Sequence, residues 1–458
     1  MLFKHSIVLC FLTSVFGVSL KTESHKPRVC VIGAGIAGLN SAYYLKEAGL
    51  NFTVLEGTQY VGGTWRYDPR VGTDEFGVPI HTSMYKHLRT NLPKQTMQLS
   101  GFPMPDDYRS FETWKRFYEY LKSYAKKFDL EKYMKFNHLV ESVKREENSW
   151  KVKSKNLKTG EYVMDDCDFV FVGTGHHHTP NMPNFPGEEL FNGTIIHSHD
   201  FRDTVPFEGR RVLVVGRGPS GLDISVDIAY VSKKLVHSHH SKTKVGTPFP
   251  DNFVEKPDVA RFTENGAYFT DGSFEELDDV VYCTGFKTAL PFLDESSGLT
   301  MGSRYVYPLH HYMVNINQPT MVLLGFVELA CTVTTIGAQA RYAVALATGN
   351  FTLPSKEDMM AKWQARADSI KEKGRPMSDI LVIGEKENEY YEDISNESGT
   401  YKIPPVIYSM RDVDQQSMME NWYTFREYEY QLIDDHTFSR CLQDPKSKTP
   451  CVQKIHGQ

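Results

Sequence analysis

Two stretches of the chain repeat the same order of apolar and polar positions. Each begins with a short apolar run, Arg28–Ile32 or Arg211–Val215, which predicts a buried strand. An amphipathic helix follows each run, and a second strand follows each helix, Phe52–Leu55 in the first stretch and Lys234–His237 in the second. A strand, a helix and a second strand in this order are typical of a parallel α/β unit. The pattern therefore predicts two such units in one chain.

The turn between the first strand and its helix has the sequence G-x-G-x-x-G, with Gly33, Gly35 and Gly38 at the glycine positions. In a dinucleotide site the first glycine makes the tight turn, the second lets the backbone approach the pyrophosphate, and the third lets the helix pack on the strand. The helix N-terminus offers N–H groups to the phosphates. Glu56, at the end of the next strand, is suited to accept both hydroxyls of an adenosine ribose. The complete order predicts a dinucleotide site.

The second unit carries the same glycine pattern but differs at the ribose position. Its turn predicts a cofactor site formed by Gly216, Arg217, Gly218, Ser220 and Gly221. Counted from the first glycine, the place that Glu56 takes in the first unit is taken here by His239. An acid would repel a 2′-phosphate, whereas Arg217 and the neighbouring histidines tolerate one. We therefore assign FAD to the first unit and NADPH to the second.

Two further apolar runs, Asp168–Val172 and Asp279–Cys283, end in Thr-Gly turns on either side of the second unit. Ligands bind at the carboxyl ends of strands in such sheets, and these turns leave room for a cofactor or a chain crossover. We expect an α/β fold with two Rossmann-like dinucleotide-binding domains, the NADPH domain inserted into the FAD domain. The expected boundaries are 26–178 and 285–458 for the FAD domain and 179–284 for the NADPH domain.

Charge and composition exclude some classes of function. Of 458 residues, 40% are hydrophobic and 24% charged, so the chain can bury a core and is not disordered. With 51 Lys and Arg against 57 Asp and Glu, the net charge is -6, and no basic excess favours nucleic acid.

Lys4 and the apolar run Ile7–Val18 predict a signal peptide over residues 1–19 and hence secretion. No second apolar stretch reaches spanning length, so we expect no membrane anchor in the mature protein.

Secretion changes the interpretation of the cysteines. In an oxidising compartment, Cys441 and Cys451 in the polar tail are expected to form a disulfide. Cys30, Cys167 and Cys283 lie in apolar runs and are expected to be buried thiols. Four N-x-S/T sequons, at Asn51, Asn192, Asn350 and Asn396, predict glycosylation. The better candidates are Asn350 and Asn396.

A third pattern lies between the two glycine turns. Phe191–Phe201 fits F-x-G-x-x-x-H-x-x-x-F/Y, with His197 at the histidine position. With a G-x-G-x-x-G turn on each side, it resembles the identifying pattern of the flavin-containing monooxygenases. Gly62–Tyr67, Thr90–Lys94 and Gln339–Arg341 also resemble stretches of that family. The family often has an acid two residues before the last of these, where this chain has Gly337. The signal peptide adds a resemblance to the secreted insect branch, whose members N-oxidise pyrrolizidine alkaloids in haemolymph.

The resemblance implies the chemistry. NADPH reduces FAD, the reduced flavin and O2 form a C4a-hydroperoxide, and one oxygen passes to a soft nucleophile such as a tertiary amine or a sulfide. Asn91 is the implied catalytic residue, because a neutral amide near the flavin both donates and accepts hydrogen bonds; its other interpretation is an Asn that closes a turn. The same resemblance implies further cofactor-binding residues, namely Gly63, Thr64, Trp65, Arg66 and Gln339. The other interpretation of Trp65 is an aromatic side chain of the core.

Alternatives remain at this point. A Baeyer–Villiger monooxygenase is disfavoured because no tryptophan follows Phe201 in the linker pattern, and a disulfide reductase would need a closely spaced cysteine pair. An S-oxygenating monooxygenase and a secreted flavoprotein without turnover stay open as functions. The oligomeric state is also open, and a homo-oligomer is one possibility.

No metal site is expected, because His176, His177 and His178 are adjacent and so point to different sides of an extended chain. Residues 377–398 are rich in Glu, Asn and Ser, and we expect a surface excursion there.

Overall fold

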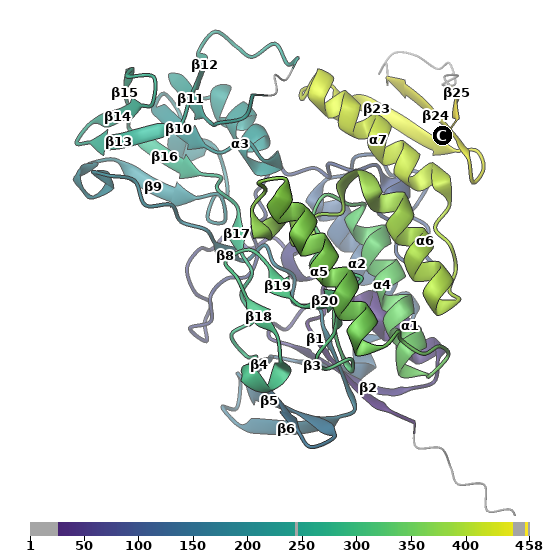
Figure 1. The fold of residues 1–458 in the computed structure, drawn as a ribbon. Helices are drawn as coiled ribbons and strands as arrows, with labels where there is room; N and C mark the ends of the chain where they lie inside the picture. The colour runs from purple at the N-terminus through teal and green to yellow at the C-terminus, as the bar shows by residue number, and fades with distance from the viewer. Residues whose placement is uncertain (1–25, 243–245, 443–453, 457–458) are drawn as a thin grey trace, which may run out of the picture.

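The computed structural model describes residues 26–242, 246–442 and 454–456. The predicted signal peptide, residues 1–19, lies outside the described residues. The described chain forms two large sheets, one partly and one fully parallel, each with its own core, and a set of C-terminal helices (Figure 1). None of the helices in these ranges combines the length and the apolar character that a membrane crossing requires.

The first sheet contains the first predicted unit. Its strand order is β20-β21-β22-β7-β1-β2-β3, and the parallel part runs from β22 to β3. Helix α1 packs against α4 in the main core, and α2 contributes a buried face in which Phe117, Leu121 and Tyr124 follow the helical period. The elements are β1 (Arg28–Ile32), α1 (Ile36–Glu47), β2 (Asn51–Glu56), α2 (Trp114–Lys127), β3 (Met134–Phe136), β7 (Phe169–Val172), β20 (Leu309–His310), β21 (Val314–Asn315), β22 (Met321–Leu323) and α4 (Thr332–Ala347).

The second sheet is fully parallel and has the order β12-β11-β10-β16-β9. Its central strand β10 has four fully or largely buried residues in a row, as a strand covered on both faces requires. A small antiparallel sheet, β13-β14-β15, packs beside it. The elements are β9 (Thr194–His197), β10 (Arg211–Val215), α3 (Pro219–Ala229), β11 (Lys234–Ser238), β12 (Phe253–Lys256), β13 (Val259–Thr263), β14 (Gly266–Phe269), β15 (Phe274–Glu276) and β16 (Asp279–Tyr282).

Two linkers join the sheets side by side. β8 (Thr179–Pro180) leaves the first sheet, β17 (Phe286–Lys287) returns to it, and the two pair antiparallel (Figure 1). Asn181 fixes the pair, because its N–H donates to the Gly285 carbonyl (3.0 Å) and its side-chain amide to the Thr284 carbonyl (3.1 Å). Along the chain, the second sheet is thus inserted between β7 and β20 of the first, and the predicted fold class is confirmed. The exact domain boundaries stay a prediction.

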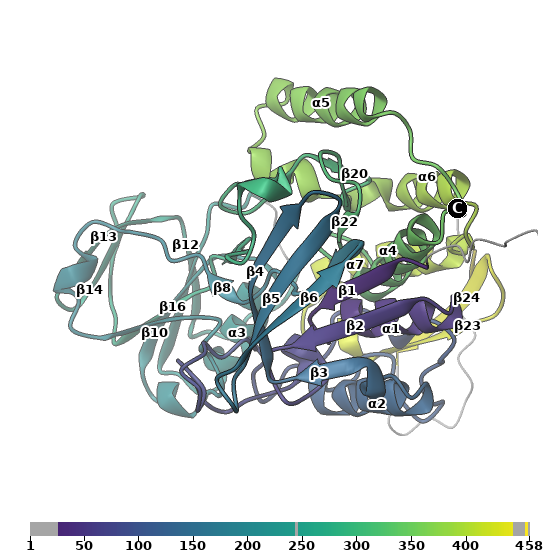
Figure 2. The ribbon, with the colours of Figure 1, turned by 90° about the horizontal axis from the view of Figure 1, so that it is seen from below.

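The C-terminal part consists of α5 (Lys356–Glu372), α6 (Glu387–Ser398), α7 (Pro405–Glu420) and the strands β23 (Tyr428–Leu432), β24 (Thr437–Leu442) and β25 (Lys454–His456). The expectation of a surface excursion over residues 377–398 is wrong. Tyr390, Tyr391 and Ile394 are buried on one face of α6, which packs against α4, so the segment forms a helix of the core rather than an excursion. Helix α5 lies farther out, at the top of Figure 2.

The expectation that Cys30 and Cys167 are free thiols is also wrong. They form a disulfide across 137 residues, with their Cα atoms 5.8 Å apart. The antiparallel sheet of β4 (His138–Glu146), β5 (Ser149–Asn156) and β6 (Tyr162–Cys167) ends at Cys167, directly before β7, and β7 pairs with β1. This path brings Cys167 next to Cys30. Cys283 is a buried free thiol, as predicted. Cys441 is disulfide-bonded, and its predicted partner Cys451 lies outside the described residues.

Candidate cofactor sites

The first glycine turn, Gly33–Gly38, joins β1 to α1 and admits only glycine at its two ends. Gly33 has a φ of 94°, and a Cβ there would lie 2.8 Å from the Gly173 carbonyl oxygen. A Cβ on Gly38 would lie 1.9 Å from the Gly33 carbonyl oxygen. Strand and helix therefore touch backbone to backbone, as the sequence pattern predicts for a dinucleotide turn.

Gly35 has a different environment, because a Cβ there would meet nothing closer than the Gly63 Cα at 3.6 Å. Gly35 is the N-cap of α1, which has no side-chain cap and no acid in its first turn. The first N–H groups of the helix are therefore available to an external acceptor. Together with the helix dipole, they form a site for an anion such as a pyrophosphate.

Glu56 lies at the carboxyl end of β2, against this turn. One carboxylate oxygen accepts from the Ala34 N–H (2.7 Å), and the other from the Thr58 N–H (2.8 Å) and hydroxyl (2.7 Å). Burial raises the pKa of Glu56, although these hydrogen bonds act in the opposite direction. The carboxylate is thus held beside the turn, the position from which it would meet a ribose.

The predicted segment Gly63–Arg66 lies directly on the first glycine turn. The Gly62 N–H donates to the Ala34 carbonyl (2.9 Å), and a Cβ on Gly63 would lie 3.0 Å from the Gly35 Cα. The Thr64 hydroxyl oxygen is buried and has no partner among the described residues. The ring of Trp65 packs against a core aromatic of α2, Phe117, with 4.3 Å between ring centroids.

Arg66 is already engaged by protein groups. Its guanidinium forms an ion pair with Asp68 (3.3 Å) and lies 3.9 Å from the centre of the Tyr60 ring. Contact of Arg66 with a phosphate therefore stays a prediction, as does contact of Trp65 with the flavin.

Gln339 supports a turn at the same edge of the sheet. Its side-chain oxygen accepts from the Gly325 N–H (2.9 Å), and its amide nitrogen donates to the Tyr390 hydroxyl (2.9 Å). Gly325 follows β22, and the preceding Leu324 N–H donates to the Val172 carbonyl at the end of β7 (2.9 Å). The fully buried Gln339 thus holds the turn after β22 beside the turn after β7.

Asn91 lies in a loop that is anchored at both ends. The Thr90 N–H donates to the Glu112 carbonyl (2.8 Å), and the Lys94 N–H to the Ser110 carbonyl (2.7 Å). Asn91 itself is half-buried. Within the described chain, the Asn91 side chain makes no hydrogen bond to either glycine turn, so its catalytic role stays a prediction.

The second glycine turn, Gly216–Gly221, repeats the geometry of the first. A Cβ on Gly216 would lie 2.4 Å from the Cys283 carbonyl oxygen, and one on Gly221 would lie 2.1 Å from the Gly216 carbonyl oxygen. A Cβ on Gly218 would meet nothing within 4 Å, and Gly218 is the N-cap of α3 without a side-chain cap. Ser220 lies in the first turn of α3, and Arg217 is half-buried in the loop before it.

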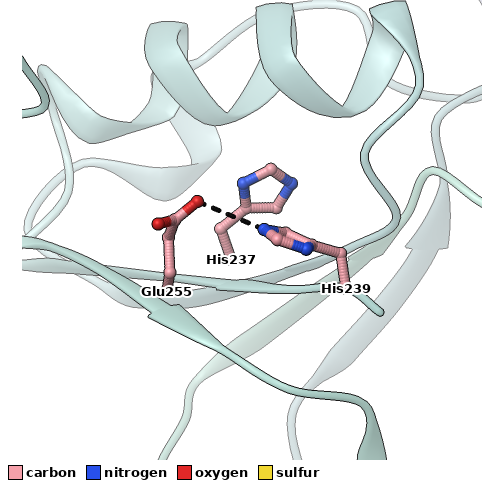
Figure 3. A group of neighbouring side chains, drawn as sticks. All are labelled: His237, His239 and Glu255. Atoms are coloured by element: carbon pink, nitrogen blue, oxygen red, sulfur yellow. Dashed lines mark hydrogen bonds and ion pairs between the residues drawn. The ribbon is translucent and has the colours of Figure 1, made fainter. Parts of the chain in front are cut away.

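His239 has an acidic neighbour that counting along the chain could not reveal. Its Nε2 lies 3.2 Å from a carboxylate oxygen of Glu255, which comes from the adjacent strand β12 (Figure 3). His237 faces the turn, with its Nε2 2.9 Å from the Gly216 carbonyl oxygen, and burial lowers its pKa to about 4. The position itself is not acidic, but an acid from the neighbouring strand lies next to it and is paired with the His239 imidazole.

A polar contact between α3 and the C-terminal segment was not predicted from the sequence. The Arg426 guanidinium donates to both Asp223 carboxylate oxygens (2.8 Å each) and to the Thr90 carbonyl (3.0 Å). Asp223, on α3, also accepts from Trp422 (2.7 Å) and from the Tyr85 hydroxyl (2.8 Å). One arginine thus holds both the helix of the second glycine turn and the residue before Asn91. A single Arg far along the chain gives no local pattern that could reveal this.

Histidines gather around the linkers. His197 ends β9, and its ring packs against Phe286 of the returning linker, with 5.3 Å between centroids. Burial lowers its pKa to about 4, so it is neutral near pH 7. His178 stacks on His81 (4.8 Å between ring centroids), and Thr82, next to His81, donates its hydroxyl proton to the Thr64 carbonyl. These rings therefore extend from the linkers to the first glycine turn.

Several buried polar atoms in this region have no hydrogen-bond partner among the described residues. They include the Thr64 hydroxyl and ring nitrogens of His176, His178, His197 and His239. Buried polar atoms are normally satisfied, and a bound ligand is one way to satisfy them. Together with two uncapped helix N-termini and two glycines that leave room for phosphate, these residues fit two dinucleotides.

Comparison with known proteins gives the family. The model described as flavin-binding monooxygenase-like matches residues 26–248 and 250–435. Senecionine N-oxygenase of Tyria jacobaeae is 39% identical over 449 residues, which cover 96% of this chain and 97% of the relative. Trimethylamine monooxygenase of Methylocella silvestris is 31% identical over 420 residues, 88% of each chain. The structure of S-allyl-L-cysteine S-oxygenase from Allium sativum matches with a TM-score of 0.82 and 27% identity, over 88% of this chain and 95% of that one.

These similarities extend over both glycine turns and the linker pattern between them. They confirm the resemblance drawn from the sequence, and with it the expected pair of cofactors, FAD and NADP(H). The chain belongs to the flavin-binding monooxygenase family, as an enzyme that uses FAD and NADPH.

Proposed function

We propose that the enzyme transfers one oxygen atom from O2 to the nitrogen of tertiary amines, pyrrolizidine alkaloids such as senecionine among them. The observation that carries this proposal is the 39% identity to senecionine N-oxygenase, over nearly the full length of both chains. The match to a trimethylamine monooxygenase also supports a tertiary amine nitrogen as the acceptor. S-oxygenation is the second candidate, favoured by the likeness to S-allyl-L-cysteine S-oxygenase.

In this proposal FAD occupies the first glycine turn and NADPH the second. When bound, the two cofactors supply the electrons that activate O2. The N-terminus of α1 binds the FAD pyrophosphate, Glu56 orients the ribose, and Gln339 fixes the neighbouring turn. The inserted segment, residues 179–284, carries NADPH on α3, while 26–178 and 285–458 carry FAD. The membership of the strands in two sheets supports this division.

A substrate panel tests the proposal. The purified enzyme is incubated with NADPH and air, together with a pyrrolizidine alkaloid, trimethylamine, an alkyl sulfide or a cyclic ketone. We expect a mass gain of one oxygen on the nitrogen of the amines, with the highest kcat/KM for the alkaloid. A product from the sulfide alone would establish the S-oxygenation candidate instead, and a ring-expanded ester from the ketone would contradict both.

We predict that Asn91→Ala uncouples the enzyme. The loop of Asn91 is anchored by Thr90 and Lys94, so the substitution removes an amide without releasing the backbone. NADPH should still be consumed, while N-oxide per NADPH falls by roughly tenfold and hydrogen peroxide rises, because about 1.4 kcal/mol of preference for transfer is lost. The ratio of product to NADPH measures this. Unchanged coupling would show that Asn91 only closes a turn.

We predict that His239→Glu weakens NADPH selectivity. A carboxylate at this position, in addition to Glu255, would face the 2′-phosphate of the cofactor without a compensating imidazole. Binding of NADP+ relative to NAD+, measured by calorimetry, should fall by roughly tenfold or more, about 1.4 kcal/mol. His239→Gln is the matched control and should lose less. Equal selectivity in the parent and in His239→Glu would contradict this assignment of the site.

We also propose that the enzyme is secreted. The amino-terminal pattern supports this, as does the buried Cys30–Cys167 disulfide, because such bonds persist in oxidising compartments. The four sequon asparagines are all exposed, so exposure does not separate them, and Asn396 lies on α6 rather than in a loop. Recovery of the enzyme from the medium of expressing cells, with a new N-terminus near residue 20, would support secretion; retention with Met1 intact would contradict it.

A further inference from the structure

Two histidines and a glutamate converge at the far edge of the first sheet. The Nε2 atom of His310 lies 2.8 Å from one carboxylate oxygen of Glu397, and the Nε2 atom of His311 lies 3.3 Å from the other. The Tyr342 hydroxyl donates to the same carboxylate. His310 ends the edge strand β20, Glu397 lies on α6 and Tyr342 on α4, so three separate elements meet here.

The backbone is shaped to bring the two imidazoles together. Adjacent side chains in a strand point to opposite faces. Here His311 has a φ of 46° and Tyr312 a φ of 59°, both in the left-handed region that residues other than glycine rarely adopt. The ring centroids of His310 and His311 are consequently only 4.0 Å apart. Backbone strain of this kind persists only where the surrounding structure enforces it, and strained residues are concentrated at functional sites.

The donor set matches a metal-binding chemistry. One ligand atom from each of His310, His311 and Glu397 lies within 4.8 Å of the others. Two imidazole nitrogens and one carboxylate are a known protein ligand set for Zn²⁺, with water in the fourth position. A small movement of the three side chains would bring each donor atom to about 2.0–2.2 Å from one ion. The Tyr342 hydroxyl, bonded to Glu397, would orient the carboxylate from behind.

Solvent and ions also have access to the group of His310, His311 and Glu397. His310 and His311 line a hollow of about 290 Å³ between β20, α5 and α6, together with Tyr312, Lys362, Trp363 and Asp393. The exposed fractions of the His311 and Glu397 side chains, 12% and 17%, exceed the 2% of His310. An ion could enter from the hollow, and water or a small anion next to Lys362 could complete its coordination.

We propose that His310, His311 and Glu397 bind one zinc ion, which joins the edge of the first sheet to α6. Glu397 is 87 residues from His310 and 86 residues from His311 in the chain, which is why no sequence spacing indicated this group. The described residues hold one other group of this composition, His237, His239 and Glu255, but that group belongs to the second glycine turn. Neither glycine turn supplies one of the three donors, and the zinc site does not depend on the proposed substrate.

Zinc titration of the metal-stripped, flavin-loaded enzyme tests this proposal. Calorimetry should give a zinc stoichiometry that falls by one ion per chain in Glu397→Gln and in His311→Ala. His239→Ala is the matched control for the other group and should leave this ion in place. Cobalt(II) should give the intense visible absorption of a four-coordinate site in the parent enzyme, and this should vanish in the same two variants. Saturating zinc should raise the Tm of the parent by several degrees and leave that of these variants unchanged, because a ligand that binds only the folded state stabilises it.

The proposal fails if the parent binds no zinc at micromolar concentration. It also fails if Glu397→Gln and His311→Ala keep the parent stoichiometry, or if His239→Ala alone removes the bound ion. If Glu397→Gln does not fold, His311→Ala decides the question, because His311 is partly exposed and its loss leaves the Glu397 contacts with His310 and Tyr342 intact. Circular dichroism and flavin content verify that each variant is folded.

Discussion

One added methyl group at position 38 is expected to remove FAD from the enzyme. A Cβ on Gly38 would lie 1.9 Å from the Gly33 carbonyl oxygen and 2.9 Å from the Gly33 carbonyl carbon. Both are backbone atoms at the junction of β1 and α1, so no side-chain rotation can relieve the overlap. We expect Gly38→Ala to destabilise the fold by about 3 kcal/mol or more, the upper range for overpacking. Flavin per chain and the free energy of unfolding in urea measure this.

Gly35→Ala is the matched control within the same turn. Its methyl would lie 3.6 Å from the nearest atom, an ordinary contact distance, so the protein should fold with nearly unchanged stability. It should nevertheless bind FAD weakly, because the methyl would occupy the space through which the pyrophosphate approaches the backbone. If Gly38→Ala retained stoichiometric FAD and parental stability, the turn would not be packed as the structure shows.

The second large effect is expected at Arg426. Its guanidinium and the Asp223 carboxylate expose only 12% and 15% of their side chains, and together they join α3 to the C-terminal segment. In Arg426→Ala, the Asp223 carboxylate would lose its main partner in a largely buried place. Breaking a buried pair on one side costs about 3–5 kcal/mol. Urea unfolding should show this loss, and NADP+ affinity should fall, since α3 carries the second glycine turn.

Arg109→Ala serves as the control for Arg426. Arg109 forms an ion pair with Glu427 (3.3 Å), but 44% of its side chain is exposed, and exposed pairs contribute about 0–1 kcal/mol. Arg426→Lys should recover little, because an ammonium cannot reproduce two parallel hydrogen bonds to one carboxylate. An Arg426→Ala variant no less stable than Arg109→Ala would refute the structural role of this contact.

Local patterns predicted the parts of the fold that local physics determines. The strands Arg28–Ile32 and Arg211–Val215 lie where their apolar runs predicted them, because a buried parallel strand needs a continuous apolar stretch and a glycine turn then ends it. The same holds for Glu56, whose place at the end of β2 follows from the fixed length of the unit.

Contacts between distant segments could not be predicted in this way. Cys30 and Cys167 each lie in an apolar run, and only the order of β6, β7 and β1 makes them neighbours. Glu255 reaches His239 from an adjacent strand, and Arg426 meets Asp223 across 203 residues. Each of these pairs depends on how strands and domains are placed side by side, which no periodicity along the chain encodes.

We expect the two nucleotide sites of this chain to act together as one monooxygenase. The origin of the transferred oxygen tests this directly. FAD-loaded enzyme is incubated with NADPH, isotopically labelled O2 and a pyrrolizidine alkaloid, and the label in the product is measured. We expect an N-oxide that carries one labelled oxygen atom for each NADPH oxidised, and no product when NADPH is omitted. NADPH oxidation without labelled product, or an N-oxide whose oxygen comes from water, would contradict it.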